Sequence, residues 1–392
     1  MNICHIITRL IIGGAQENTI LTCAGLHDRG HRVTLLVGPE TGPEGSLHDE
    51  AHRGGYDVRI VPNMCRAVRP LTDLRARREL AAVLRDLRPE VVHTHSSKAG
   101  ILGRLAARDA GVPIIVHTIH GMSFNRTQSW PVQMLYRRLE GYCARFTQAL
   151  VTVADAMRDQ AVAVGMAPRD KFVTVYSGMR TELFDPAGAD RAAVRRRWGV
   201  ADEEIVIGAV ARLFRNKGYE VLIPAMALAA QRNSRLRFVW VGDGAQRTDY
   251  EKQLESLGIL GRVHLTGLLA PQRVPEMLAG MDLLVHASQW EGLPRAAVQA
   301  LLMECPVISF DIDGAPEVVL PGRTGALVRL NDVPGLAEAM VTLARDASER
   351  RRLGKAGRQL CLERFDQRKM VTELESLYLK LQKDAGPNRA HR

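Results

Sequence analysis

The sequence predicts an α/β protein that contains two doubly wound domains, each built around a parallel sheet. Short β-rich runs alternate with longer helical stretches in the first part of the chain, and a second series of the same kind follows. Such alternation is typical of a parallel sheet covered by helices on both faces. The length of 392 residues suits two domains of ordinary size.

The first series predicts five strands with a helix between each strand and the next. The expected strands are Asn2–Ile7, Arg32–Val37, Val91–His95, Ile114–Thr118 and Leu150–Val153. The expected helices are Asn18–Arg29, Asp73–Leu87, Ala99–Ala110 and Val132–Arg145. Open sheets of this kind bind ligands at the carboxyl ends of their strands, so residues that follow these strands are the first candidates for a site.

The second series repeats the pattern after a segment, Tyr176–Gly199, that we interpret as a linker. Its expected strands are Ile205–Val210, Arg237–Val241, Val263–Thr266, Leu283–His286 and Val307–Phe310. Its expected helices are Glu220–Gln231, Gln272–Ala279 and Arg295–Met303, with a late helix at Thr372–Lys383. We therefore expect domains at residues 1–178 and 179–366, a C-terminal helix within 367–384 that returns to the first domain, and a polar tail at 385–392. The two domains are expected to face one central cleft.

The charge balance favours anionic partners. Lys and Arg number 53 against 43 Asp and Glu, a net charge of +10. Basic clusters occur at Arg75, Arg77 and Arg78 and at Arg195, Arg196 and Arg197. These are either solvated helix faces or a patch that holds the protein on an anionic membrane surface. Nucleic acid is excluded as a partner, because no aromatic residues interleave with the basic ones and no recognised motif is present.

The cysteines and the N-terminal segment indicate a cytoplasmic protein, peripheral to the inner face of the membrane at most. The six cysteines are scattered and form no CxxC pair, which predicts buried thiols in a reducing compartment. The N-terminal segment lacks a basic n-region and is interrupted by Arg9 and a glycine pair, so it is expected to be a strand and not a signal peptide. No apolar run approaches 18 residues.

Gly13 and Gly14 lie between the first expected strand and its helix. Glycine there lets the backbone approach a ligand, and the helix N-terminus attracts an anion; a simple tight turn is the alternative. The segment does not fit G-x-G-x-x-G, and Arg247 occupies the third glycine position of a second near match at Gly242–Gln246. A nicotinamide enzyme is therefore disfavoured.

Histidines follow two neighbouring strands. His93 and His95 share one face of a strand end, with Lys98 opening the next helix. A metal would need a third ligand, and none occurs at useful spacing, so these side chains are expected to be structural or to contact a substrate. His120, after the following strand, can hydrogen-bond a ligand hydroxyl or act as an acid or base, unless it is structural.

The second domain offers cations and an acid in two of its loops. Arg212 and Lys217 straddle the first strand-to-helix turn and suit a diphosphate, or they are solvated surface cations. Glu291 follows the strand that ends at His286 and can accept hydrogen bonds from sugar hydroxyls, or it caps a helix. Gln299 lies eight residues beyond Glu291 in the next helix.

The ordered set of motifs resembles the family-four glycosyltransferases of the GT-B fold over nearly the whole chain. The motifs are GGAQ, HTHSSKAGILGRLAA, VHTIHG, RLFRNKG, VGDG, EGLPRAAVQAL and DGAPEVV. Each is weak alone, whereas their order is specific. The set looks most like bacterial members that build cell-surface polysaccharides.

The resemblance implies roles for individual residues. His120 matches a histidine near the reaction centre, and Glu291 matches the acid that contacts the donor sugar. Arg212 and Lys217 match cations that neutralise the diphosphate. Gln299 stands where relatives carry a second acid that binds ribose, which predicts altered nucleotide contact. Further expected contacts are Gly13, Gly14 and Leu293 to the diphosphate, Gly242 and Leu268 to the nucleoside, and His95 and Lys98 to the acceptor.

The resemblance also implies the reaction: transfer with retention, without a divalent metal or other cofactor, from a nucleotide-diphosphate sugar. UDP-sugar is expected ahead of GDP-sugar, and the acceptor is expected to be a saccharide or a lipid-linked saccharide. A nucleotide-sugar epimerase of the same fold and a non-catalytic scaffold of a polysaccharide assembly complex are the alternatives. Product analysis without acceptor would identify the epimerase, and the absence of donor turnover would identify the scaffold.

Overall fold

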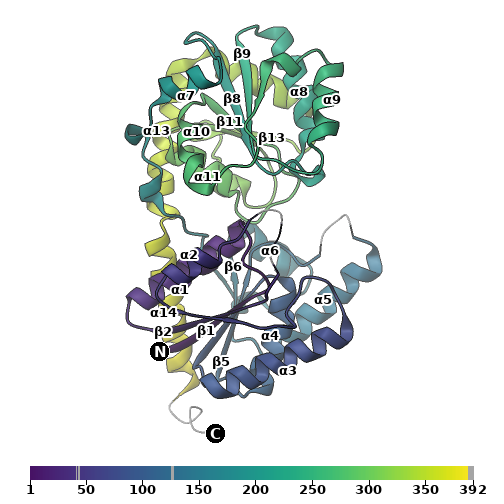
Figure 1. Cartoon of the computed structure of the whole chain (residues 1–392), viewed down its shortest axis with the longest axis vertical. Helices are drawn as coiled ribbons and strands as arrows, with labels where there is room; N and C mark the ends of the chain where they lie inside the picture. The colour runs from purple at the N-terminus through teal and green to yellow at the C-terminus, as the bar shows by residue number, and fades with distance from the viewer. Residues whose placement is uncertain (41, 43–44, 125–127, 387–392) are drawn as a thin grey trace. The chain divides into compact units, whose positions relative to one another are not determined.

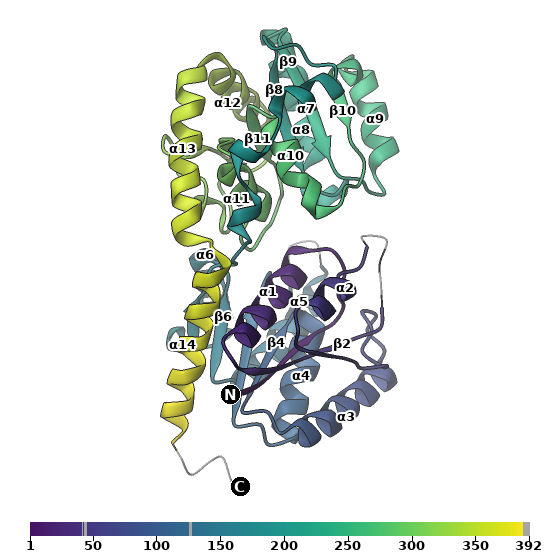
Figure 2. The same ribbon diagram turned by 60° about the vertical axis from the view of Figure 1, so that its left-hand side comes forward.

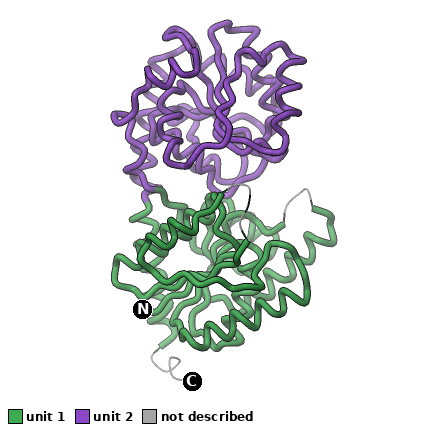
Figure 3. Tube along the Cα trace, in the orientation of Figure 1, with its two compact units in different colours: residues 1–179, 367–392 green, residues 180–366 purple. Residues whose placement is uncertain are grey.

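The computed structural model describes residues 1–40, 42, 45–124 and 128–386. It divides into two compact units (Figure 3). The first contains Met1–Met179 and Gln367–Arg392, and the second contains Arg180–Asp366. Most of the expected tail, residues 387–392, lies outside the described residues.

The first unit is a seven-stranded parallel sheet in the order β3-β2-β1-β4-β5-β6-β7. Its strands are β1 (Asn2–Ile7), β2 (Arg32–Val37), β3 (Asp57–Ile60), β4 (Val91–His95), β5 (Ile114–Ile119), β6 (Ala149–Thr152) and β7 (Phe172–Thr174). Its helices are α1 (Gly14–Asp28), α2 (His48–Arg53), α3 (Pro70–Leu87), α4 (Ser97–Asp109), α5 (Trp130–Ala144), α6 (Asp155–Ala163) and α14 (Gln367–Ala385). The five expected strands are confirmed, and β3 and β7 were missed.

Apolar residues cover both faces of this sheet. Figure 1 shows helices α1, α14, α3 and α4 around this sheet. Residues of α1 and α14 form one apolar core cluster with the strands, and residues of α3 and α4 form a second. The C-terminal helix α14 lies beside α1 (Figure 2) and buries Met370, Leu374 and Tyr378 in the first unit. The last segment of the chain is therefore part of the core around β1.

The second unit is a six-stranded parallel sheet in the order β10-β9-β8-β11-β12-β13. Its strands are β8 (Ile205–Val210), β9 (Leu236–Val241), β10 (Val263–Leu265), β11 (Leu283–His286), β12 (Val307–Phe310) and β13 (Gly325–Val328). Its helices are α7 (Arg191–Arg197), α8 (Tyr219–Arg232), α9 (Arg247–Ser256), α10 (Val274–Ala279), α11 (Arg295–Leu302), α12 (Val333–Arg345) and α13 (Ala347–Arg364). All five expected strands are present, and β13 was missed. Its apolar core packs α8 and α12 against the sheet.

Each sheet has a topological switch point, where the strand order reverses direction along the chain. It lies between β1 and β4 in the first unit and between β8 and β11 in the second. Loops that leave the two strands on either side of such a point run apart and leave a crevice that ligands occupy. The loops after β1, β4, β8 and β11 are therefore the places to look for a site.

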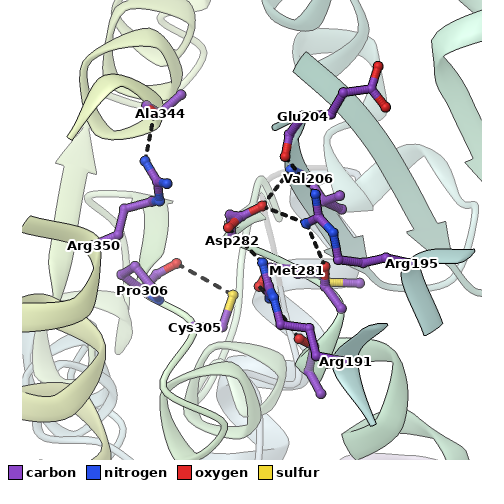
Figure 4. A network of polar contacts seen from close by, with 12 residues as sticks. Arg191, Arg195, Glu204, Val206, Met281, Asp282, Cys305, Pro306, Ala344 and Arg350 are labelled. Carbon is purple, nitrogen blue, oxygen red and sulfur yellow. Dashed lines mark hydrogen bonds and ion pairs between the residues drawn. The ribbon is translucent and has the colours of Figure 1, made fainter. Parts of the chain in front are cut away.

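The linker predicted at Tyr176–Gly199 is wrong beyond Met179, because residues from Arg180 onward pack in the second unit and include α7. Arg195 of this helix is 4% exposed. Its guanidinium donates to Asp282 Oδ2 at 3.0 Å and to the carbonyls of Ala201 and Glu204 at 2.8 and 2.6 Å (Figure 4). Neither interpretation of this basic cluster applies to Arg195, which ties α7 to the start of β8 and β11.

The cysteines agree largely with expectation, whereas helices α2, α6, α7, α9, α12 and α13 were not predicted. Five of the six cysteines are buried, and Cys65 is partly exposed. All six are free thiols. Within the described parts of the chain, no helix is both long enough and apolar enough to cross a membrane.

Candidate active site

The switch point of the second unit brings Lys217 and Glu291 together. Lys217 ends the short turn Arg215–Lys217 that follows β8, and Glu291 lies in the loop after β11. Lys217 Nζ lies 2.6 Å from Glu291 Oε1. The pair joins residues 74 positions apart in the chain because β8 and β11 are neighbours in the sheet.

Gly218 makes this approach feasible. Its φ of +75° is in the left-handed region, and a Cβ at this position would lie 1.9 Å from the carbonyl oxygen of Ala287. A side chain would therefore push the loop after β8 away from the loop after β11. The glycine is the N-cap of α8, and it allows the two loops to lie close enough for the ion pair.

Glu291 is held as a carboxylate. Burial alone would raise its pKa, but the charge of Lys217 and the nearby His286 ring outweigh burial and hold the pKa well below its usual range. His286 Nε2 lies 3.5 Å from the same oxygen, and the Glu291 backbone N–H donates to Asp313 Oδ2 at 2.7 Å. The loop thus fixes Glu291 by its main chain and its side chain.

Arg212 lies in the same β8–α8 loop as Lys217, and its guanidinium stacks over Phe214 at 4.9 Å from the ring centroid. Leu293 is 5% exposed, and its expected contact with a diphosphate stays a prediction. Gln299 is half-buried in the second turn of α11, a helix that begins at Arg295. Arg212 and Lys217 therefore lie in the loop after β8, and Glu291 lies in the loop after β11, at the switch point.

Gly242 and Leu268 lie at a neighbouring edge of the same unit. Gly242 has φ of +139°, and a Cβ there would meet the carbonyl oxygen of Ala211 at 2.2 Å. Its N–H donates to the carbonyl of Gly267 at 3.1 Å, which places Gly242 beside the segment that carries Leu268. Leu268 is 54% exposed, so its apolar surface is available to a flat ring.

The first unit places its candidates at the switch point between β1 and β4. Gly13 caps α1, which begins at Gly14, four residues earlier than predicted. The loops after the two strands are joined by a hydrogen bond of 2.8 Å between Thr8 Oγ1 and Ser96 Oγ. The N-terminus of α1 and the start of α4 therefore lie at the same edge of the sheet.

Lys98 holds the first unit together locally. Its Nζ lies 2.5 Å from Asp73 Oδ1 of α3, and it also donates to the carbonyl of Ala67. These two contacts anchor the segment that leads into α3. A sugar acceptor would have to compete with Asp73 and with the Ala67 carbonyl for Lys98. The structure therefore favours an anchoring role for Lys98 over the expected contact with the sugar acceptor.

His95 does not lie where an acceptor could reach it. It is 1% exposed, its Nδ1 is 3.0 Å from His120 Nε2, and its Nε2 is 2.9 Å from His5 Nδ1. The expectation of direct acceptor contact is therefore corrected: His95 can act on a substrate only through the half-buried His120. His5 was missed from the sequence, although it lies in β1, the neighbour of β4.

Three buried histidines, His5, His93 and His95, have ring nitrogens within 4.8 Å of one another. His5 supplies a third nearby ring nitrogen that the sequence spacing did not reveal. His93 is hydrogen-bonded to Tyr378 Oη at 2.5 Å and to Thr118 Oγ1 at 2.7 Å. Both nitrogens of His95 are also used, so a metal would have to break one hydrogen bond at His93 and one at His95 to gain these two ligands.

His117 is structural. It is 2% exposed, and its Nδ1 lies 2.9 Å from Thr94 Oγ1 and 3.1 Å from the Thr94 carbonyl oxygen. Burial, with help from the positive charge of Arg104, lowers its pKa to about 3. The histidine stays neutral and links β5 to β4.

Comparisons with known proteins agree with this architecture. The family model "Glycosyl transferase 4-like domain" matches residues 13–178, and "Glycosyl transferases group 1" matches residues 190–360. The structure of Anabaena HepE in complex with UDP and glucose superposes with a TM-score of 0.82 at 22% identity, covering 96% of this chain and 99% of that chain. Sucrose-phosphate synthase from Thermosynechococcus elongatus has a TM-score of 0.82 at 19% identity, covering 97% and 99%. The chain is a glycosyltransferase of the GT-B fold.

It belongs to the family-four glycosyltransferases that these two family models describe. The UDP-Gal:alpha-D-GlcNAc-diphosphoundecaprenol alpha-1,3-galactosyltransferase of Escherichia coli is 28% identical over 382 residues, which is 97% of each chain. The putative glycosyltransferase EpsD of Bacillus subtilis is 28% identical over 307 residues, or 77% of this chain and 79% of the relative.

Proposed function

We propose that this glycosyltransferase moves a sugar from a UDP-sugar to a lipid-linked saccharide, with retention at the anomeric carbon, in the synthesis of a cell-surface polysaccharide. The observation that carries the proposal is the Lys217–Glu291 pair at the switch point of the second sheet, in the loop that also holds Arg212. Two relatives support the choice of donor and acceptor. HepE was crystallised with UDP and glucose, and the name of the E. coli relative specifies UDP-Gal and a diphosphoundecaprenol-linked acceptor.

The charges of the second unit suit a diphosphate leaving group. The Glu291 carboxylate pairs with Lys217 in this structure, and Arg212 adds a positive charge of its own in the loop after β8. An incoming diphosphate would compete for Lys217 and release the Glu291 carboxylate to accept hydrogen bonds from sugar hydroxyls. Because two side-chain cations can neutralise the leaving group, we propose that the reaction needs no divalent metal. Gln299 would contact the ribose through its amide.

The proposed chemistry takes place on one face of the sugar. The bond between the anomeric carbon and the diphosphate oxygen breaks, and a new bond to the acceptor hydroxyl forms on the same side. The hydroxyl proton moves to the departing phosphate oxygen, so atoms and charge balance without a covalent enzyme intermediate. Arg212 and Lys217 would stabilise the charge that develops on the diphosphate, which is the kind of electrostatic help that dominates such reactions.

Exposed apolar and basic side chains of the first unit fit a lipid-linked acceptor on an anionic membrane. At the start of α3, Leu71 is 76% exposed beside Arg69 and Arg75, and on α5 Trp130 is 71% exposed. Leu135 on α5 is 56% exposed and lies close in sequence to the exposed Arg137 and Arg138. Helix α4 packs against both α3 and α5. Exposed apolar groups that enter the interface, together with arginines that attract anionic headgroups, are typical of peripheral membrane binding.

The test is a transfer reaction with the purified protein, a set of nucleotide sugars and a short polyprenyl-diphosphate saccharide, in the presence of EDTA. We expect a UDP-sugar to give a glycosylated product whose anomeric configuration, read by NMR, matches that of the donor. Inversion, or a requirement for added metal, would contradict the proposed chemistry. Conversion of the donor into another nucleotide sugar without acceptor would instead identify an epimerase.

The same reaction tests the membrane proposal when the acceptor is presented in vesicles. We expect faster transfer with vesicles that contain phosphatidylglycerol than with phosphatidylcholine alone, and loss of that advantage in Trp130→Ser. The matched control is Leu257→Ser, which changes an apolar residue that is 47% exposed in the second unit. Equal rates on both vesicles would contradict the membrane role and leave the transfer reaction standing.

A further inference from the structure

Three histidines on neighbouring strands form one chain of hydrogen bonds in the first unit. His5 lies in β1, His95 ends β4, and His120 directly follows β5. His5 Nδ1 lies 2.9 Å from His95 Nε2, and His95 Nδ1 lies 3.0 Å from His120 Nε2. The chain thus runs from the buried interior of the sheet to the half-buried histidine at its edge.

The two inner histidines are neutral. Burial lowers the pKa of His5 to about 3. Burial, together with the neighbouring histidines, holds the pKa of His95 well below its usual range. A neutral imidazole carries one N–H, so each inner histidine offers one donor and one acceptor nitrogen, and His95 uses both. Once the N–H proton of one histidine is assigned to a nitrogen, the hydrogen bonds determine which nitrogen of the next histidine carries its proton.

Two proton arrangements satisfy both hydrogen bonds. In one, His120 donates to His95 and His95 donates to His5, which leaves a proton on His5 Nε2. In the other, the direction is reversed, and His5 Nε2 keeps a lone pair. His5 Nε2 is buried and has no hydrogen-bond partner among the described residues. An orphaned buried N–H is rarer than an under-used acceptor, so the second arrangement is favoured.

We propose that His5 and His95 are positioning residues that keep the proton of neutral His120 on its Nδ1. His95 donates to His120 Nε2, so that nitrogen is occupied as an acceptor and cannot serve as a general base. His120 then meets an oxygen of the sugar substrates as a hydrogen-bond donor. This role of His120 rests on the proposed function. The donor-to-acceptor direction of the hydrogen bonds from His5 to His120 does not depend on it. A donor role for His120 agrees with a reaction in which the proton of the acceptor hydroxyl goes to the leaving phosphate.

The first test reads the protons directly in the full-length protein, without any substrate. With isotopically labelled histidine, long-range proton–nitrogen NMR correlations distinguish the two neutral tautomers of an imidazole. We expect the His95 ring to be protonated on Nδ1, and His120 Nε2 to show the shift of an unprotonated nitrogen. The opposite pattern, with His95 protonated on Nε2, would overturn the proposal even if the protein transferred sugar.

The second test compares variants at His5, the far end of the chain. Asparagine places an amide nitrogen near the position of Nδ1, whereas leucine removes the donor. We expect His5→Leu to lower kcat by about tenfold with little change in the KM of the donor, and His5→Asn to restore most of the loss. The NMR signature of His120 should shift in His5→Leu and return in His5→Asn.

Thr118→Val is the matched control. This variant removes a buried hydrogen bond of 2.7 Å between Thr118 and His93. It leaves the hydrogen bonds that join His5, His95 and His120 in place. We expect it to cost stability but to leave kcat and the His120 signature unchanged. A fall in kcat as large as that of His5→Leu would show a packing effect and overturn the proposal. A protein with no transfer activity and the expected His95 tautomer would instead refute the proposed function and leave the direction of the chain established.

Discussion

Replacing Lys217 by alanine is expected to lower the rate of sugar transfer by about 10²- to 10³-fold while the protein remains folded. Fixed groups that meet charge developing in a transition state have effects of this size, about 3–4 kcal/mol for one donor. Lys217 lies in the switch-point loop of the second sheet, 2.6 Å from Glu291. Without it, the departing diphosphate would lose one of the two cations that we propose to stabilise its charge. The measurement is kcat with saturating donor and acceptor, with circular dichroism to confirm the fold.

Arg215→Ala is the control for this variant. Arg215 is exposed and lies two residues before Lys217 in the same turn, so the variant loses the same charge from the same loop. We expect its kcat to stay within about threefold of the wild type, because exposed charges at some distance are screened by solvent. Near-normal turnover in Lys217→Ala, or equal losses in both variants, would show that Lys217 does not meet the leaving group.

Replacing Glu291 by glutamine separates the use of the donor sugar from binding of the free nucleotide. Glutamine keeps the size of the side chain but removes the charge that balances Lys217. We expect transfer to fall by about 10- to 100-fold, because charged acceptors hold hydroxyls more strongly than neutral ones. Affinity for UDP should stay equal or increase, because Lys217 no longer has a carboxylate partner. Kinetics with the UDP-sugar and calorimetry with UDP measure the two effects.

Gln289→Ala is the matched control in the same loop. The Gln289 side chain donates to Asn331 at 3.0 Å and does not take part in the Lys217–Glu291 pair. We expect both kinetics and UDP affinity to stay close to those of the wild type. Equal losses of sugar transfer and UDP binding in Glu291→Gln would contradict the assignment of Glu291 to the sugar.

Most strands of the two sheets could be predicted because inner strands of a parallel sheet are buried on both faces and are therefore continuously apolar. The missed strands β3, β7 and β13 all lie at sheet edges. Residues Asp57–Ile60 of β3 include two charged side chains and are only partly buried. Edge strands pair on one side only, so their sequences do not carry the apolar signal of inner strands.

The sequence predicted individual residues of the candidate site but not the contacts between them. Lys217 and Glu291 were each predicted from their loops, but their pairing depends on β8 lying beside β11, which only the strand order reveals. Likewise, nothing in the sequence around His5 predicts a functional role for it. That role follows only from the pairing of β1 with β4, whose register sets His5 opposite His93 and close to His95. Arg195 was read as a surface charge because burial of an arginine depends on Asp282, far along the chain.

The most direct test of the central claim, that the second unit binds a nucleoside diphosphate at its switch point, is a thermal-shift panel. The wild-type protein is heated with UDP, GDP, ADP, TDP or CMP, without added metal. A ligand that binds only the folded state stabilises it by about 2.7 kcal/mol at 100 times its Kd. We predict the largest increase in melting temperature with UDP, a smaller one with GDP and none with CMP. No increase with any nucleoside diphosphate would contradict the account.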